Sequence, residues 1–225
     1  LTENNPSLKY VPLWNDITIE RRLRHFLTDI AWNREFEKWI NLQRNQKYRS
    51  SNINWILTFN HFNDDIDKVS TDFKSSQKKA HRIKFLMQEI PTMEHLKKIR
   101  FDLYEHRKCP MCKQFDEDFL HVFTCSNSYN KVIDIMRQSQ KLLVKLLYDH
   151  ANYKVDRSTF SNIPNIWSLQ PNLTDLNFVD LIKGIVPQVL FDKVHQFTKN
   201  ITMTSLIISI FFDYIYRDIC TLVWF

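Results

Sequence analysis

Apolar residues recur at helical spacing along much of the chain. In residues 16–48 they fall every three or four positions and form one stripe, made of Leu23, Phe26, Leu27 and Ile30. We expect a helix here, with Asp16 capping its first turn and a break near Asn33. The pattern therefore predicts a helical N-terminal segment.

The same periodicity continues through the rest of the sequence. It predicts a short helix after Ser51 and longer helices at about 75–90, 91–100, 128–150, 178–185, 187–198 and 201–223. The helix at 75–90 is basic, and five of its apolar side chains are expected to face inward: Ala80, Ile83, Leu86, Met87 and Ile90. Two polar stretches, 62–72 and 152–176, lack this spacing and are predicted loops.

Composition supports a mainly α-helical fold. Glycine occurs once among the 225 residues, which largely excludes glycine-dependent hairpins and phosphate-cradling loops. The N-terminal stretch LTENNPSLKY is polar and does not resemble a secretion signal, so we expect an intracellular protein, nuclear or cytoplasmic, with reduced thiols. Charged residues interrupt the most apolar stretch, 201–225, and leave it too short for a bilayer span, so we expect no membrane partner.

Three of the four cysteines lie with one histidine in the stretch CPMCKQFDEDFLHVFTC. Cys109 and Cys112 form a C-x-x-C pair, in which a tight turn brings two thiolates together. His121 and Cys125 are four residues apart and share one face of a helical turn. Three thiolates and one imidazole, a CCHC set, are typical ligands of Zn²⁺. Four protein ligands leave no position for a reacting water, so the motif predicts one structural zinc. The alternative is four free side chains in a core.

The fourth cysteine, Cys220, lies far from this cluster in the apolar C-terminal stretch. Because its neighbours are mainly large apolar residues, we expect it to be a small buried hydrophobic residue. A zinc coordinated by four other residues needs no fifth ligand. The sequence therefore places Cys220 outside the metal site.

Positive charge is concentrated before the cysteine motif. The net charge is +6, and residues 73–108 carry 10 Lys and Arg against 4 Asp and Glu. Such a surplus beside a metal motif favours a polyanion partner, and a solvated helix face is the alternative. We assign nine residues to a nucleic-acid-binding face: Lys78, Lys79, Arg82, Lys84, Lys97, Lys98, Arg100, Arg107 and Lys108. Tyr104 and His106 are candidates for stacking on an unpaired base, although packing within the metal-binding lobe is favoured for Tyr104.

Residues 81–125 resemble the zinc-binding segment that follows the polymerase in many non-LTR retrotransposon reverse transcriptases. That segment contains a basic helix, a Leu-Pro-Thr step, a second basic helix, C-P-x-C, an acidic residue, His and Cys. The matching residues here are Arg82-Ile83-Lys84-Phe85-Leu86, Ile90-Pro91-Thr92, Leu96-Lys97-Lys98, Cys109-Pro110-Met111-Cys112, Glu117, His121 and Cys125. Ile90 replaces the usual Leu, and three residues separate His121 from Cys125 where many relatives have four. The flanking stretches WNDITIERRLRHFLTDI, FVDLIKGIVP and FFDYIYRDI resemble fungal elements of this type more weakly.

The resemblance implies a piece of a retroelement polyprotein, or an inactive remnant of one. In such elements the segment is thought to grip template RNA or target DNA during target-primed reverse transcription. The expected partners are therefore RNA or DNA and the upstream polymerase or RNase H region, with no small-molecule substrate. We expect helical segments around a small lobe of zinc knuckle plus helix. The predicted divisions are an N-terminal segment at 1–72, a zinc-binding domain at 73–127 and a C-terminal segment at 128–225.

The sequence contains no organised catalytic motif. Reverse transcriptases carry a Tyr-x-Asp-Asp metal site, and the only adjacent aspartates here, Asp64-Asp65, follow no tyrosine and fit an acidic surface loop. We therefore expect no catalysis by this chain alone. Two other function classes stay open. One is a zinc-stapled helical scaffold for protein interactions, and the other is a metal-dependent nuclease that uses Asp64 and Asp65.

Overall fold

A computed structural model describes residues 13–19, 22–63, 73–151, 158–161, 163, 166–172 and 174–224. These residues are mainly α-helical, as predicted. No helix among them is long and apolar enough to cross a membrane. The predicted loop at 62–72 begins inside a helix, and the rest of it, including Asp64 and Asp65, lies outside the described residues.

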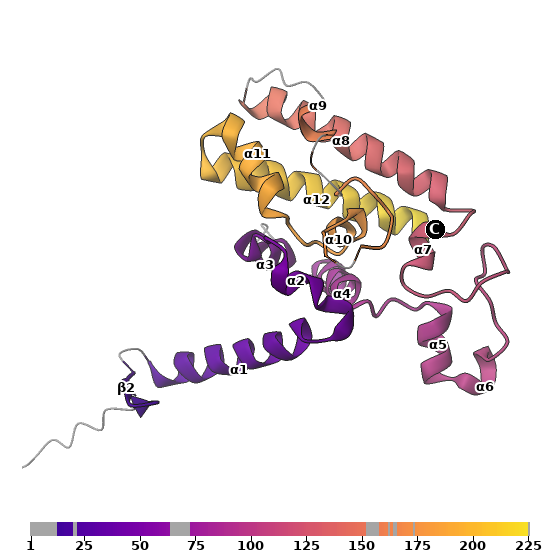
Figure 1. Cartoon of the computed structure of the whole chain (residues 1–225), viewed down its shortest axis with the longest axis horizontal. Helices are drawn as coiled ribbons and strands as arrows, with labels where there is room; N and C mark the ends of the chain where they lie inside the picture. The colour runs from indigo at the N-terminus through magenta and orange to yellow at the C-terminus, as the bar shows by residue number, and fades with distance from the viewer. Residues whose placement is uncertain are drawn as a thin grey trace, which may run out of the picture. The chain divides into compact units, whose positions relative to one another are not determined.

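The chain divides into two compact units, Leu1–Arg49 (the first unit) and Ser50–Phe225 (the second unit). The first unit contains β1 (Leu13–Trp14), β2 (Ile17–Thr18), α1 (Leu23–Ile40) and a 3-10 helix (Gln43–Asn45), and α2 (Lys47–Ser50) follows. The second unit contains α3 (Trp55–Asn63), α4 (Phe73–Met87), α5 (Met93–Ile99), α6 (Phe101–Tyr104), α7 (His121–Thr124), α8 (Tyr129–Ala151), α9 (Ser158–Ser161), α10 (Phe178–Ile182), α11 (Gln188–Thr198) and α12 (Ile201–Trp224) (Figure 1). The predicted segments 73–127 and 128–225 both lie in the second unit, and the boundary between them stays a prediction.

The N-terminal helix begins later than its apolar pattern predicts. Asn15 and Asp16 have φ angles of 47° and 64° and form the two-residue turn between β1 and β2. Asn and Asp tolerate this left-handed backbone, which a tight hairpin requires at both central positions. Asp16 therefore turns a hairpin and does not cap a helix. After it, α1 continues without the break expected near Asn33.

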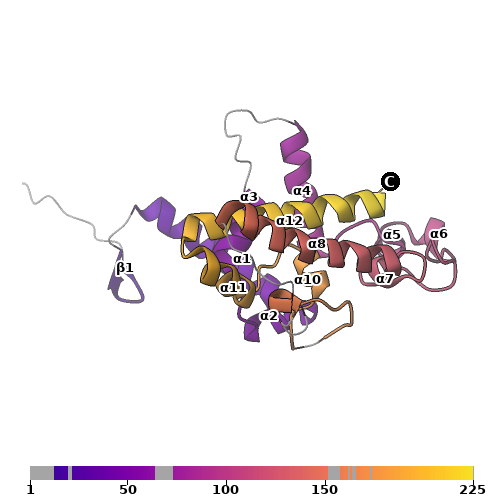
Figure 2. The same cartoon turned by 90° about the horizontal axis from the view of Figure 1, so that it is seen from above.

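The core of the second unit is built around α12. Helix α8 packs along it, and α10 and α11 also contact it (Figures 1 and 2). Four side chains spaced four residues apart on α12 are completely buried: Ile207, Phe211, Ile215 and Ile219. On α8, Val132, Leu143 and Leu147 are also completely buried. Each such side chain contributes about 2 kcal/mol by leaving water.

The single glycine ends α10. Gly184 has a φ of 84°, and a Cβ there would lie 3.0 Å from Cζ of Phe62 and 3.1 Å from Cδ2 of His61. Both the backbone angle and the lack of space favour glycine at this position. Helix α10 therefore ends at Ile182, slightly before the predicted limit, and α3 can approach it closely.

Helix α4 is rotated relative to the prediction. Arg82 and Phe85 are buried, whereas Ile83 is 43% exposed and Ala80 is exposed. Of the five side chains expected to face inward, only Ile90, which lies beyond the end of the helix, is fully buried. Apolar periodicity failed here because an arginine occupies the inward face.

Arg82 is the polar link between α4 and the rest of the second unit. Its guanidinium donates a hydrogen bond to the His61 carbonyl oxygen at 2.7 Å and pairs with the Asp213 carboxylate on α12. The guanidinium carbon also lies 5.2 Å from the centre of the Tyr216 ring. With only 4% of its side chain exposed, Arg82 is not available to a nucleic acid. Its assignment to the binding face is therefore corrected.

His61 makes stability depend on pH in mild acid. Burial, and after it the charges of Arg82 and Lys78, lower the pKa of His61 from 6.5 to about 3. Above pH 6.5 the imidazole is neutral in both the folded and unfolded states. Below pH 6.5 only the unfolded state takes up the proton, so the folded state loses stability until about pH 3. Between pH 7 and pH 4.5 the expected loss is about 2 kcal/mol.

We therefore expect His61→Gln to lose about 2 kcal/mol less stability than the wild type over this pH interval. Urea unfolding of both proteins at pH 7 and pH 4.5 measures the difference. Other acid-sensitive groups are common to the two proteins and cancel in the comparison. Equal losses in the two proteins would show that His61 does not titrate as its burial implies.

Candidate metal centre

The four predicted ligands converge in the structure. One donor atom from each of Cys109, Cys112, His121 and Cys125 lies within 4.8 Å of the other three. The sulfur of Cys112 is 3.4 Å from Nε2 of His121, and the sulfurs of Cys109 and Cys125 are 3.9 Å apart. None of these cysteines forms a disulfide. The four side chains could therefore bind one metal ion.

The first two ligands come from a tight turn. The Lys113 N–H donates to the Cys109 carbonyl oxygen at 2.8 Å, and Lys113 adopts a left-handed backbone with a φ of 60°. The Cys109 N–H donates to the Phe115 carbonyl oxygen, also at 2.8 Å. These bonds fold the chain back on itself, so the sulfurs of Cys109 and Cys112 lie on the same side of the turn, near the other two donor atoms.

The other two ligands come from the single helical turn α7. The Asp118 carboxylate accepts a hydrogen bond from the His121 N–H at 2.6 Å and so caps the start of this turn. The Cys125 N–H donates to the His121 carbonyl oxygen at 2.7 Å and closes it. The four-residue spacing thus places the imidazole and the thiol on one face, as predicted.

The opposite face of this turn packs into the core. Phe119 and Phe123 each lie two residues before a ligand, and their side chains are 6% and 0% exposed. Their rings are 5.3 Å apart, and each lies 6.5 Å from the ring of Phe85 on α4. The Nζ of Lys183 lies 5.3 Å from the centre of the Phe119 ring. Aromatic packing therefore fixes the turn that carries His121 and Cys125 to α4.

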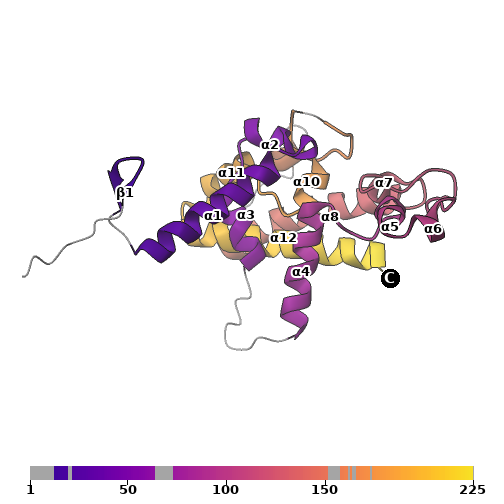
Figure 3. The same cartoon turned by 90° about the horizontal axis from the view of Figure 1, so that it is seen from below.

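We call residues 91–128 the cysteine lobe. Its helices α5, α6 and α7 lie together at one end of α8 and α12 (Figure 3). Cys220 lies apart from the cluster on α12 and is half-buried, not fully buried as expected. Among the described residues, the four ligands form the only cluster of three or more His, Cys, Asp and Glu side chains with metal-binding geometry.

The thiols at the site differ in acidity. Hydrogen bonds from the backbone N–H groups of Gln114 and Phe115 lower the pKa of Cys112 to about 6. Burial raises the pKa of Cys109 to about 11. Cys112 is therefore the more acidic of these two thiols, and a bound cation would favour the thiolate form of its cysteine ligands.

Glu117 connects the cluster to α5. Its side chain is 8% exposed, and its two oxygens accept a hydrogen bond from the Met93 N–H at 3.1 Å and from the Cys109 thiol at 3.8 Å. Its carbonyl oxygen also accepts from the Glu94 N–H at 3.0 Å, while Thr92 caps the helix. Spacing alone did not reveal this role, although the resemblance includes an acidic residue here.

Most of the predicted basic face is already paired with carboxylates. Lys97 and Lys108 both bind Asp116, at 2.7 Å and 3.1 Å. The remaining ion pairs are Lys98 with Glu94, Arg100 with Asp102, and Lys78 with Asp213. Lys79, Lys84 and Arg107 are exposed, and Lys84 and Arg107 form no ion pair with any described residue. Asp116 and Asp213 come from other parts of the chain, so sequence spacing does not reveal them. Glu94 lies four residues before Lys98 and Asp102 lies two residues after Arg100, so these two partners had a local sequence signal.

The exposed aromatic residues of the lobe are mainly not the predicted ones. Tyr104 is half-buried, whereas the side chain of His106 is 92% exposed. Phe101 and Phe115 are each 61% exposed and were not identified from the sequence. Their only sequence signal is that each adjoins charged or polar residues outside a regular apolar stripe.

Comparison with known proteins identifies no relative. No family model, no curated protein and no solved structure matches this chain. The resemblance to retrotransposon zinc-binding segments therefore rests on the residues of 81–125 themselves.

Proposed function

We propose that this chain is a non-catalytic nucleic-acid-binding module stabilised by one structural zinc ion, of the type found after the polymerase in non-LTR retrotransposon reverse transcriptases. In this role it grips template RNA or target DNA during target-primed reverse transcription. The observation that carries the proposal is the convergence of three thiols and one imidazole within 4.8 Å. Exposed lysines and arginines of residues 73–108 support it. Thiol and imidazole ligands favour Zn²⁺ over Mg²⁺ or Ca²⁺, which prefer oxygen.

The ion pairs on the basic surface are compatible with phosphate binding. The side chains of Lys98 and Arg100 are 69% and 56% exposed, and those of their acidic partners are 48% and 62% exposed. Exposed ion pairs contribute only about 0–1 kcal/mol, so a phosphate can replace the carboxylate at little cost. The proposed face therefore keeps eight of its nine residues and excludes Arg82.

The test is fluorescence anisotropy of the zinc-loaded chain with a labelled RNA hairpin at about 50 and 200 mM salt. Lys97→Ala with Lys98→Ala is expected to keep zinc and to weaken binding about tenfold at the lower salt, since two phosphate contacts are lost. The slope of log affinity against log salt should fall in magnitude by about 1.5.

The matched control is Lys141→Ala with Lys145→Ala, which removes the same charge from exposed positions on α8. This variant is expected to bind nearly as well as the wild type. Equal weakening by both pairs of substitutions would indicate a general charge effect and not a binding face on the cysteine lobe.

A second candidate function, a protein-interaction scaffold, is favoured by one feature of the first unit. An open apolar groove of about 730 Å³ runs along α1 and is lined by Leu23, Leu27, Ala31 and Trp32, among others. Trp32 is 71% exposed. Exposed apolar surface of this kind is typical of interaction sites. Weak binding of RNA that does not change with salt would favour the scaffold over the nucleic-acid module.

A further inference from the structure

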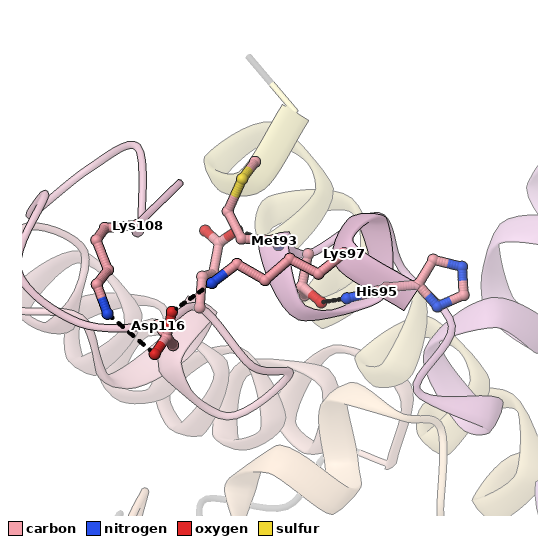
Figure 4. A network of polar contacts seen from close by, with 7 residues as sticks. Met93, His95, Lys97, Lys108 and Asp116 are labelled. Atoms are coloured by element: carbon pink, nitrogen blue, oxygen red, sulfur yellow. Dashed lines mark hydrogen bonds and ion pairs between the residues drawn. The ribbon is translucent and has the colours of Figure 1, made fainter. Parts of the chain in front are cut away.

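Two lysines that lie 11 residues apart converge on one carboxylate at the surface of the cysteine lobe. Nζ of Lys97, on α5, lies 2.7 Å from one oxygen of Asp116, and Nζ of Lys108 lies 3.1 Å from the other (Figure 4). The two ammonium groups therefore contact opposite oxygens of the same acidic group.

The metal-binding turn sets this geometry. Lys108 directly precedes Cys109, and Asp116 directly follows Phe115, and the Cys109 N–H bonds to the Phe115 carbonyl oxygen at 2.8 Å. The side chain of Lys97 is 21% exposed and that of Lys108 is 47% exposed. Asp116 is 60% exposed, so its carboxylate faces water and not the core.

A phosphodiester offers the same chemistry as this carboxylate. Each presents two oxygens that share one negative charge on a single central atom, and lysine ammonium groups bind both. The charges on the two lysines and Asp116 sum to +1, whereas the lysines alone would carry +2. The Asp116 carboxylate and the Lys108 ammonium face water, so their pairing adds little to stability and its main effect is on the local potential.

We propose that Lys97 and Lys108 form a phosphate clamp and that Asp116 occupies it in the free protein. Asp116 is thus an internal competitor that a nucleic-acid phosphate must displace. Asp116 limits the affinity for phosphate, because its carboxylate neutralises one of the two lysine charges. This inference rests on the proposed function, and it identifies where a backbone phosphate binds and which residue opposes it.

Asp116→Asn tests the clamp, because it keeps the shape of the side chain and removes its charge. At about 50 mM salt the zinc-loaded variant is expected to bind the labelled RNA hairpin about fivefold more tightly than the wild type. Its affinity should also fall more steeply with salt. In a Lys108→Ala background, Asp116→Asn should raise the affinity for the hairpin less than about twofold.

The charge-matched control is Asp134→Asn on α8. The side chain of Asp134 is 69% exposed and pairs with Arg137, so the substitution removes one paired carboxylate outside the lobe. Its affinity should stay within about twofold of the wild type. Zinc content and circular dichroism establish that each variant is folded.

The outcomes separate this inference from the proposed function. Salt-dependent binding by the wild type with no gain in Asp116→Asn would overturn the clamp alone. An equal gain in Asp134→Asn would also overturn it, because the effect would then be general. Absence of binding by all folded variants at the lower salt would overturn both the clamp and the nucleic-acid module.

Discussion

Cys112→Ser is expected to abolish stoichiometric zinc binding and to unfold the cysteine lobe, residues 91–128. The lobe has only short helices, α5, α6 and α7, and few fully buried apolar side chains of its own. Zinc binding at a site with four protein ligands is worth about 10 kcal/mol, which is enough to decide whether such a lobe folds. Metal analysis of the purified protein and its circular dichroism spectrum measure the two effects.

The matched control is Cys220→Ser, which removes the one cysteine outside the cluster. This variant is expected to bind one zinc ion per chain and to keep the lobe folded. A chelator added to the wild type should reproduce the effect of Cys112→Ser, because both remove the ion. The proposed structural role would be wrong if the metal-free wild type kept the same spectrum and the same unfolding midpoint.

Arg82→Met is expected to lower the free energy of unfolding by about 3 kcal/mol. The substitution leaves the His61 carbonyl oxygen and the Asp213 carboxylate without their buried donor. Breaking a buried pair from one side costs about 3–5 kcal/mol, and the lower value applies because Asp213 is half-exposed and can gain water. Urea unfolding at pH 7 measures the loss.

Lys78→Met serves as the comparison, because Lys78 lies 3.7 Å from the same Asp213 oxygen but is 41% exposed. An exposed pair contributes at most about 1 kcal/mol, so this variant should remain close to the wild type. If Arg82→Met were equally mild and instead weakened RNA binding, Arg82 would act at the surface and not as a link between helices.

The metal ligands could be found from the sequence because they depend on local spacing. The C-x-x-C turn and the His-x3-Cys turn each bring two ligands together through local backbone geometry. The rest of the fold only has to place these two pairs side by side. The helices around α8 and α12 were predicted for a similar reason, since long apolar stripes identify a buried face directly.

Other features depend on partners far along the chain, and the sequence did not reveal them. The inward position of Arg82 requires Asp213, which lies 131 residues away. Lys97 pairs with Asp116, which lies 19 residues away on the other side of the C-x-x-C turn. The hairpin at Asn15 and Asp16 differs from the prediction because both residue types also begin helices, and the apolar spacing that follows them favours a helix.

The attachment of α5 to Glu117 has a thermodynamic consequence. This residue holds the start of α5 through the N–H groups of Met93 and Glu94, and it also contacts the Cys109 thiol. Under the proposed function, the same helix carries lysines that contact phosphate. Metal occupancy and nucleic-acid affinity are then linked equilibria. If bound zinc raises the affinity for RNA by a given factor, bound RNA raises the affinity for zinc by the same factor.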